Sequence, residues 1–181
     1  MKRGWFQRPQ SGGATLLLLV AVLGSGCGYA LVGRATSVPD DVRVVYLKTF
    51  ENRTSRVQLD EILTRAVADE LVTRKRFQLS PSLDDAQAEI RGAVTGLDVT
   101  PVSLDAQGRA TEYQIIITVQ VRFLRANEEH TVLWASDRYQ FRKSYPVDVS
   151  RALYFDRENL ALEDVSQDFA ETMVSDLLEG F

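Results

Sequence analysis

The stretch YQIIITVQVRF, which runs from Tyr113 to Phe123, alternates apolar and polar side chains along its length. Its alternate apolar positions are Tyr113, Ile115, Ile117, Val119, Val121 and Phe123. Successive side chains of a β-strand point to opposite faces of the sheet, so this alternation indicates a strand with one buried face. We therefore expect a long strand here that lies on the core.

The segments on either side extend the same sheet. After a polar turn at Asn127–His130, the chain resumes extended character from Thr131 to Lys143, which predicts a long hairpin. Before the strand, an alternating pattern begins at Ala88 and changes phase at Gly96. An extra residue in one strand produces such a shift, so we expect a β-bulge at this glycine.

Two segments have helical spacing. Apolar residues recur every three or four positions within Leu59–Leu71 and again within Leu162–Leu178, as on the buried face of a helix. Ser55 is followed by Gln58 three residues later, which resembles a capping box at the start of the first helix. A Val-rich stretch before this helix, Val42–Phe50, predicts a strand.

The order of these elements indicates the fold class. Phe77–Leu79 is a candidate short strand after the first helix, so the order is strand, helix, three or four strands, helix. We predict an α+β fold with two helices packed on one face of a mixed, mostly antiparallel sheet of four strands. The chain has 181 residues, of which 45% are hydrophobic, which suits one domain with a sizeable core.

The first residues differ from the rest of the chain. Lys2, Arg3 and Arg8 form a basic leader, and Ala14–Leu23 is almost wholly apolar. This is the layout of a secretory signal peptide, and the apolar run is about half of the roughly 20 residues that a membrane-spanning helix needs. Small residues then precede Cys27, the single cysteine. We predict a lipoprotein signal peptide over residues 1–26, cleaved before a lipid-bearing Cys27.

The lipid would decide where the mature protein is held. Three acyl chains on Cys27 supply enough apolar area for stable anchoring, because one chain alone binds a membrane only marginally. Gly28 stands where Asp would be the usual inner-membrane retention signal. We expect residues 27–181 to form a single domain anchored on the periplasmic side of the cell outer membrane.

The mature chain is acidic. Removing residues 1–26 takes away three of the 21 basic residues and none of the 25 acidic ones, so the formal net charge changes from −4 to −7. This balance argues against nucleic acid as a partner, because nucleic-acid binding needs a broad basic surface. An anionic ligand would need a local basic cluster.

The sequence does not point to an enzyme. His130, the single histidine, falls in the predicted turn beside Glu128 and Glu129, where a solvated residue is the simpler interpretation. The adjacent Asp84 and Asp85 are interpreted as solvated loop charges, and no phosphate-binding glycine-rich loop is present. We expect no catalytic site, no metal and no cofactor. A lipid-anchored hydrolase would need a carboxylate pair or nucleophile assembled from distant strands.

Basic side chains recur along the predicted hairpin and near its ends. They are Arg122, Arg125, Arg138, Arg142 and Lys143 on the two strands, Arg109 in the preceding loop and Arg157 before the last helix. Guanidinium groups match phosphate geometry, so the set is a candidate anion site. A polar sheet face balanced by nearby glutamates explains it equally well.

Several residues, taken in order, resemble a known family. They are Cys27-Gly28-Tyr29, Leu31, Gly33, Pro39, Phe50-Glu51-Asn52-Arg53-Thr54, Leu59, Leu71 and Ala110-Thr111-Glu112-Tyr113. The ordered set resembles the lipopolysaccharide-assembly lipoprotein family LptE over essentially the whole mature chain. The resemblance implies two helices on a four-stranded mixed sheet and no cofactor. It also implies a plug and assembly chaperone inside the LptD β-barrel, which binds lipopolysaccharide on its way to the outer leaflet.

The resemblance also points to basic residues as lipopolysaccharide contacts. Aligned on Glu112-Tyr113, the family's basic positions fall on Ala106 and Phe155, and Arg109 and Arg157 lie close to them. With the hairpin residues, the candidate ligand-binding set is Arg109, Arg138, Arg142, Lys143 and Arg157. The alternative is another outer-membrane lipoprotein with the same Asn-x-Thr start, acting in a secretion pore or an envelope scaffold.

Overall fold

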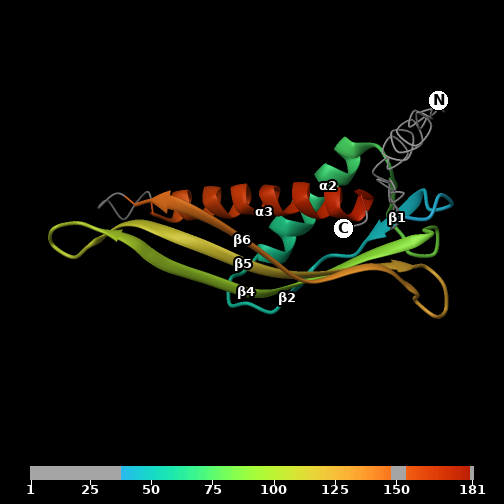
Figure 1. Ribbon diagram of the computed structural model, residues 1–181, viewed down its shortest axis with the longest axis horizontal. Helices are drawn as coiled ribbons and strands as arrows, with labels where there is room; N and C mark the ends of the chain where they lie inside the picture. The colour runs from blue at the N-terminus through green and yellow to red at the C-terminus, as the bar shows by residue number, and fades with distance from the viewer. Residues whose placement is uncertain (1–37, 148–153, 180–181) are drawn as a thin grey trace, which may run out of the picture. The chain divides into compact units, whose positions relative to one another are not determined.

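The computed structural model describes residues 38–147 and 154–179, so the predicted signal peptide and Cys27 lie outside the described residues. All described residues belong to one compact unit. Its elements, in chain order, are β1 (Val44–Leu47), β2 (Glu51–Asn52), α2 (Leu59–Arg74), β3 (Gln78–Ser80), β4 (Ala88–Leu104), β5 (Ala110–Arg125), β6 (Val132–Pro146) and α3 (Tyr154–Glu179) (Figure 1).

The sheet is mixed, as predicted, but has six strands instead of four. Its order is β3-β1-β4-β5-β6, and β2 also pairs with β4. The segment expected as one strand, Val42–Phe50, contains the shorter β1, and β2 follows it directly; both pair in parallel with different parts of β4. The candidate strand after the first helix is confirmed as β3, parallel to β1. The long strands β4, β5 and β6 pair antiparallel.

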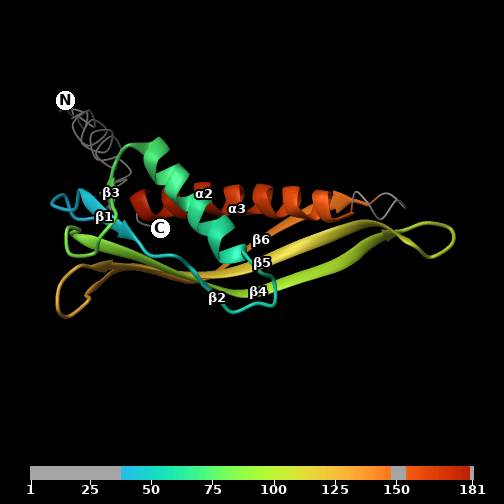
Figure 2. The same ribbon diagram turned by 180° about the vertical axis from the view of Figure 1, so that it is seen from behind.

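Both helices cover one face of this sheet, and Figures 1 and 2 show α2 and α3 on the same side from opposite viewpoints. The predicted alternation of β5 is confirmed, since Ile115, Ile117, Val119 and Phe123 are fully buried. The polar residues between them face the other way, so the sheet has an open face. The expected bulge also appears, as a register shift between Val94 and Gly96.

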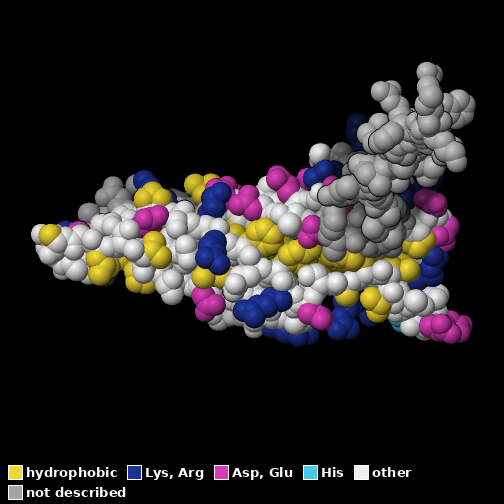
Figure 3. Space-filling view, viewed as in Figure 1, with side chains coloured by type: hydrophobic (Ala, Val, Ile, Leu, Met, Phe, Trp, Pro, Cys, Tyr) yellow, Lys and Arg dark blue, Asp and Glu magenta, His cyan; other side chains and the backbone are white. Residues whose placement is uncertain are grey.

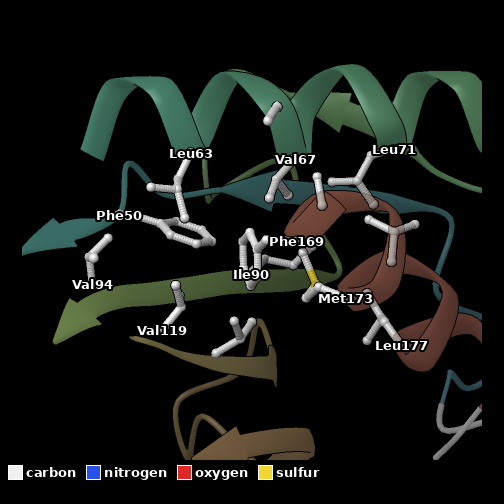
Figure 4. Packing of buried hydrophobic residues seen from close by; sticks show 14 of the residues in the cluster. Phe50, Leu63, Val67, Leu71, Ile90, Val94, Val119, Phe169, Met173 and Leu177 are labelled. Carbon is white, nitrogen blue, oxygen red and sulfur yellow. The ribbon is translucent and has the colours of Figure 1, made fainter. Parts of the chain in front are cut away.

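The core lies between the helices and the sheet (Figure 4). Phe50, which follows β1, meets Phe169 of α3 edge to face, with ring centroids 6.1 Å apart. Gly92 of β4 leaves room for the Phe50 ring. Leu63 and Val67 of α2 are fully buried over the same region. One aromatic side chain therefore connects both helices to the sheet.

Candidate functional site

The Phe50–Thr54 motif includes β2 and begins the loop that leads to α2, and hydrogen bonds among its side chains and backbone close this loop. The Oδ1 atom of Asn52 accepts hydrogen bonds from the backbone N–H and the hydroxyl of Thr54, at 2.9 and 2.8 Å. The side-chain amide of Asn52 donates to the carbonyl of Arg56 at 2.7 Å, and the N–H of Arg56 donates to Oγ1 of Thr54 at 3.2 Å. The motif therefore fixes backbone geometry, and its polar side chains bond each other.

This loop also overturns the predicted capping box. Helix α2 begins at Leu59, its N-cap is Gln58 with φ at 68°, and no side chain caps the helix end. Ser55 lies three residues before the N-cap. An N-cap side chain must reach the second or third N–H of the helix, so Ser55 is too early in the chain to cap it.

Arg56 connects this loop to α3. Its Nη1 atom lies 3.2 Å from Oε1 of Glu158, and its Nη2 atom donates to Oδ1 of Asn159 at 2.6 Å. The Glu158 side chain is only 11% exposed. Arg56 thus satisfies a largely buried carboxylate and holds the start of α2 against α3.

Arg109 lies in the β4–β5 turn and is held by Asp105. The Asp105 carboxylate accepts hydrogen bonds from the N–H groups of Gln107 and Arg109, both at 2.9 Å, and from Nε of Arg109 at 2.8 Å. The Arg109 N–H, and then its guanidinium group, hold the pKa of Asp105 below its usual value. The Arg109 side chain remains 59% exposed.

Lys143 and Arg142 are adjacent in β6 and have different surroundings. Nζ of Lys143 lies 3.5 and 3.6 Å from carboxylate oxygens of Asp164 and Asp168 on α3. Arg142 and Arg138 are exposed, and neither forms an ion pair within residues 38–147 and 154–179. Lys143 is therefore partly neutralised, while these two arginines are open to a ligand.

The structure brings four of the five candidate ligand residues toward one end of the sheet, with Arg142 and Lys143 on opposite faces of β6 four and three residues from Pro146. Nη1 of Arg157 donates to the carbonyl of Pro146 at 3.5 Å, and Pro146 pairs with Glu112 in the ladder. Arg109 lies three residues beyond Glu112, roughly 10 Å along the strand. Arg138 lies eight residues back along β6 from Pro146, roughly 26 Å away. The five residues do not form one cluster.

The remaining arginines of the predicted cluster, Arg122 and Arg125, have different partners. Arg125 binds Asp41, with nitrogen–oxygen distances of 2.7 and 3.3 Å, and lowers the pKa of that carboxyl. Arg122 pairs in register with Arg91 of β4. Sequence reasoning missed Arg91, because only the ladder register shows that it lies opposite Arg122, and it missed Arg53, which follows β2 and lines a hollow together with both of these arginines.

The described residues offer no metal site and no membrane-spanning helix. Within residues 38–147 and 154–179, no three or more His, Cys, Asp or Glu side chains are grouped so as to hold a metal ion. In the same residues, no helix is long and apolar enough to cross a membrane. His130 is exposed in the β5–β6 turn, with φ at 45°.

Solved structures share this fold at low sequence identity. Uncharacterized lipoprotein B from Nitrosomonas europaea is 16% identical, with a TM-score of 0.55 over 83% of this chain and 90% of its own. Rare lipoprotein B from Shewanella oneidensis is 19% identical, with a TM-score of 0.50 over 73% and 92%. A PelC dodecamer from Paraburkholderia phytofirmans is 13% identical, with a TM-score of 0.50 over 78% and 91%. These likenesses show the fold alone.

The family comparison is more specific than the fold. No curated protein matches the chain in sequence. The model of the LptE lipopolysaccharide-assembly family matches residues 42–177, which runs from just before β1 to the last turns of α3. That match covers well over half of the chain and nearly all of its described elements. The chain therefore belongs to the LptE family of lipopolysaccharide-assembly proteins.

Proposed function

We propose that this protein is a lipid-anchored plug and assembly chaperone of an LptD-type outer-membrane β-barrel, and that it binds lipopolysaccharide during transport to the outer leaflet. The observation that carries the proposal is the family match over residues 42–177. Because the match includes both helices and every strand of the sheet, the proposal concerns the whole folded unit and not a single motif.

The proposed anchor is a lipid on Cys27. A basic leader, an apolar run of limited length and small residues precede this single cysteine. Acyl chains on Cys27 would hold the domain at the periplasmic surface of the outer membrane, where a barrel partner is within reach.

The proposed lipopolysaccharide contact is at the β4–β5 turn. The Arg109 side chain is 59% exposed there, with its Nε bound to Asp105 and its terminal nitrogens left for a ligand, and Val102 and Leu104 on the same hairpin are 47% and 63% exposed. Lipopolysaccharide carries phosphate groups next to acyl chains. A cation beside exposed apolar side chains matches both parts of such a molecule.

Arg138 and Arg142 extend the proposed contact along β6. Both are exposed and outside the ion pairs of the described residues, so a ligand phosphate would not have to displace a carboxylate. Lys143 and Arg157 are proposed as weaker contributors, because Asp164, Asp168 and a backbone carbonyl already engage them.

We also propose that the protein is not an enzyme and uses no cofactor. The only histidine lies exposed in a turn, and the Asn52 and Thr54 side chains are occupied in loop hydrogen bonds. Covalent catalysis usually requires a general base within hydrogen-bonding reach of a nucleophile. If purified protein shows no hydrolytic activity on envelope lipids, that result will agree with this proposal.

The decisive experiment combines affinity capture with depletion. Tagged full-length protein, extracted from outer membranes in mild detergent, should carry an LptD-type barrel with it. Depleting the protein should lower surface lipopolysaccharide and leave that barrel misassembled. A normal barrel after depletion would contradict the proposal, and recovery of a self-assembled ring in place of a barrel would favour the secretion-pore alternative.

A further inference from the structure

Two arginines lie directly opposite each other on the open face of the sheet. The antiparallel register pairs Arg91 of β4 with Arg122 of β5. The preceding pair, Ile90 with Phe123, is fully buried on the helix side. Successive residues of a strand point to opposite faces, so both arginines face away from the helices.

A hollow surrounds this arginine pair. It has a volume of about 500 Å³, and its lining includes Arg53, Gln120 and His130. Arg53 is placed there by its own N–H, which donates to the carbonyl of Val94 at 2.9 Å. Figure 3 shows Lys and Arg side chains along the lower edge of the molecule, below the helices.

The charges around the hollow do not balance. Arg53 is paired with Glu51 at 2.7 Å, and Nη2 of Arg91 lies 2.6 Å from Oε2 of Glu89, whose side chain is 2% exposed. Arg122 takes part in no ion pair of the described residues. Three guanidinium groups therefore face two carboxylates, and one positive charge remains uncompensated.

The arginine pair also leaves a hydrogen-bond donor unused. The Nε atom of Arg91 is buried and has no hydrogen-bond partner within the described part of the chain. Like charges directly opposite in a ladder destabilise the pairing, and a buried N–H without an acceptor costs free energy. The Glu89 carboxylate raises the pKa of Arg91, so this guanidinium group stays charged. An anion between Arg91 and Arg122 would relieve the repulsion between the two opposed guanidinium groups.

We propose that this hollow binds a phosphate group between the guanidinium groups of Arg91 and Arg122. Phosphate presents oxygens in several directions, so it can accept hydrogen bonds from two opposed guanidinium groups at once. The site lies twelve residues along β5 from Ala110, roughly 40 Å from the β4–β5 turn. It is therefore separate from Arg109, while Arg138, proposed above as an extension of the lipopolysaccharide contact, lies on the neighbouring strand near Gln120. The proposal does not depend on either residue.

The test uses the full-length protein in non-ionic detergent, titrated with inorganic phosphate at constant ionic strength. Backbone and arginine Nε–H resonances at Arg91 and Arg122 should shift and saturate. Arg122→Gln should raise the apparent dissociation constant about tenfold or more, because it removes a charge-assisted hydrogen bond. Arg65→Gln is the matched control, since Arg65 is exposed on α2 and loses the same charge. Binding in this control should equal that of the wild type.

A second pair of probes separates the sources of the phosphate group. Dihexanoyl phosphatidic acid, used below its micelle concentration, is compared with dihexanoyl phosphatidylcholine. Tighter binding of phosphatidic acid than of inorganic phosphate would identify a lipid headgroup, and equal binding would identify free phosphate. The proposal is overturned if neither inorganic phosphate nor phosphatidic acid gives saturable shifts at Arg91 and Arg122. It is also overturned if Arg122→Gln binds these probes as tightly as Arg65→Gln does.

Discussion

The ring of Phe50 fills the space in front of Gly92, where an added Cβ atom would lie 2.5 Å from two of the ring carbons. Phe50 is 2% exposed and packs edge to face on Phe169 of α3. The ring therefore has little room to move. A glycine in β4 is what allows the segment after β1 to bring an aromatic side chain between the sheet and both helices.

Gly92→Ala should destabilise the fold by about 1–3 kcal/mol, because the new methyl group would overpack the core against Phe50. Gly96→Ala is the matched control in the same strand, since a Cβ atom added at Gly96 would lie 3.4 Å from its nearest neighbour, the side chain of Thr118. Urea unfolding monitored by circular dichroism measures both. Equal stability of the two variants would contradict the close approach of Phe50 and Gly92.

Thr54→Val should lower the free energy of unfolding by about 1–2 kcal/mol, because valine has nearly the shape of threonine but lacks the hydroxyl that makes two hydrogen bonds. The lost bonds are those to Oδ1 of Asn52 and from the N–H of Arg56. Thr54→Ser keeps the hydroxyl and should recover most of the loss. If serine and valine behave alike, the loop hydrogen bonds do not stabilise the protein.

Arg56→Met should cost about 1.5–3 kcal/mol, because it strips a largely buried carboxylate of a charged hydrogen-bond partner. That carboxylate is Glu158, 11% exposed. The double variant Arg56→Met with Glu158→Gln should be more stable than Arg56→Met alone, since no unpaired charge remains. Denaturant unfolding of the wild type and the three variants, including Glu158→Gln alone, completes the cycle. A double variant no better than the single one would refute the pairing.

The stability of the protein should fall above about pH 10 partly because of Tyr139. Burial raises the pKa of Tyr139 above its usual value, and so does the carboxylate of Asp176, which accepts a hydrogen bond from the Tyr139 hydroxyl at 2.7 Å. The unfolded chain then releases this proton at lower pH than the folded chain does. The stabilisation is fully present below the unfolded pKa and is lost as pH rises toward the folded pKa.

Tyr139→Phe removes this contribution. Between pH 9 and 11, roughly spanning the tyrosine pKa, the variant should lose less stability than the wild type. Denaturant unfolding measured at several pH values gives the two slopes. Parallel slopes would show that Tyr139 keeps an ordinary pKa in the folded protein.

Arg109→Glu combined with Arg138→Glu should weaken lipopolysaccharide binding without unfolding the domain. Both side chains are exposed, so the change acts on the ligand's phosphates more than on the core. The matched control is Arg43→Glu with Arg65→Glu, which alters the net charge by the same amount at two other exposed sites. Lipopolysaccharide capture by each purified, folded variant is the measurement. Equal binding by both double variants would remove the proposed contact.

Local side-chain patterns were sufficient for the regular elements of this protein. The alternation around Ile117 identified β5, the phase change at Gly96 identified a bulge, and the apolar stripes identified both helices. These features depend on neighbours within a few residues, so they can be inferred from the chain itself. The predicted number of strands was wrong because β1 and β2 are short. Each pairs in parallel with β4, and this pairing depends on residues far away in the sequence.

The surfaces were decided by the tertiary structure. The sequence by itself determined that arginines are frequent on β5 and β6, and that residues 42–177 match one family. Only the folded ladder places Arg91 opposite Arg122, commits Arg125 to Asp41 and leaves Arg142 exposed. The physical reason is that a charge acts on whatever lies within a few ångströms of it, and register and helix packing choose those neighbours from remote parts of the chain.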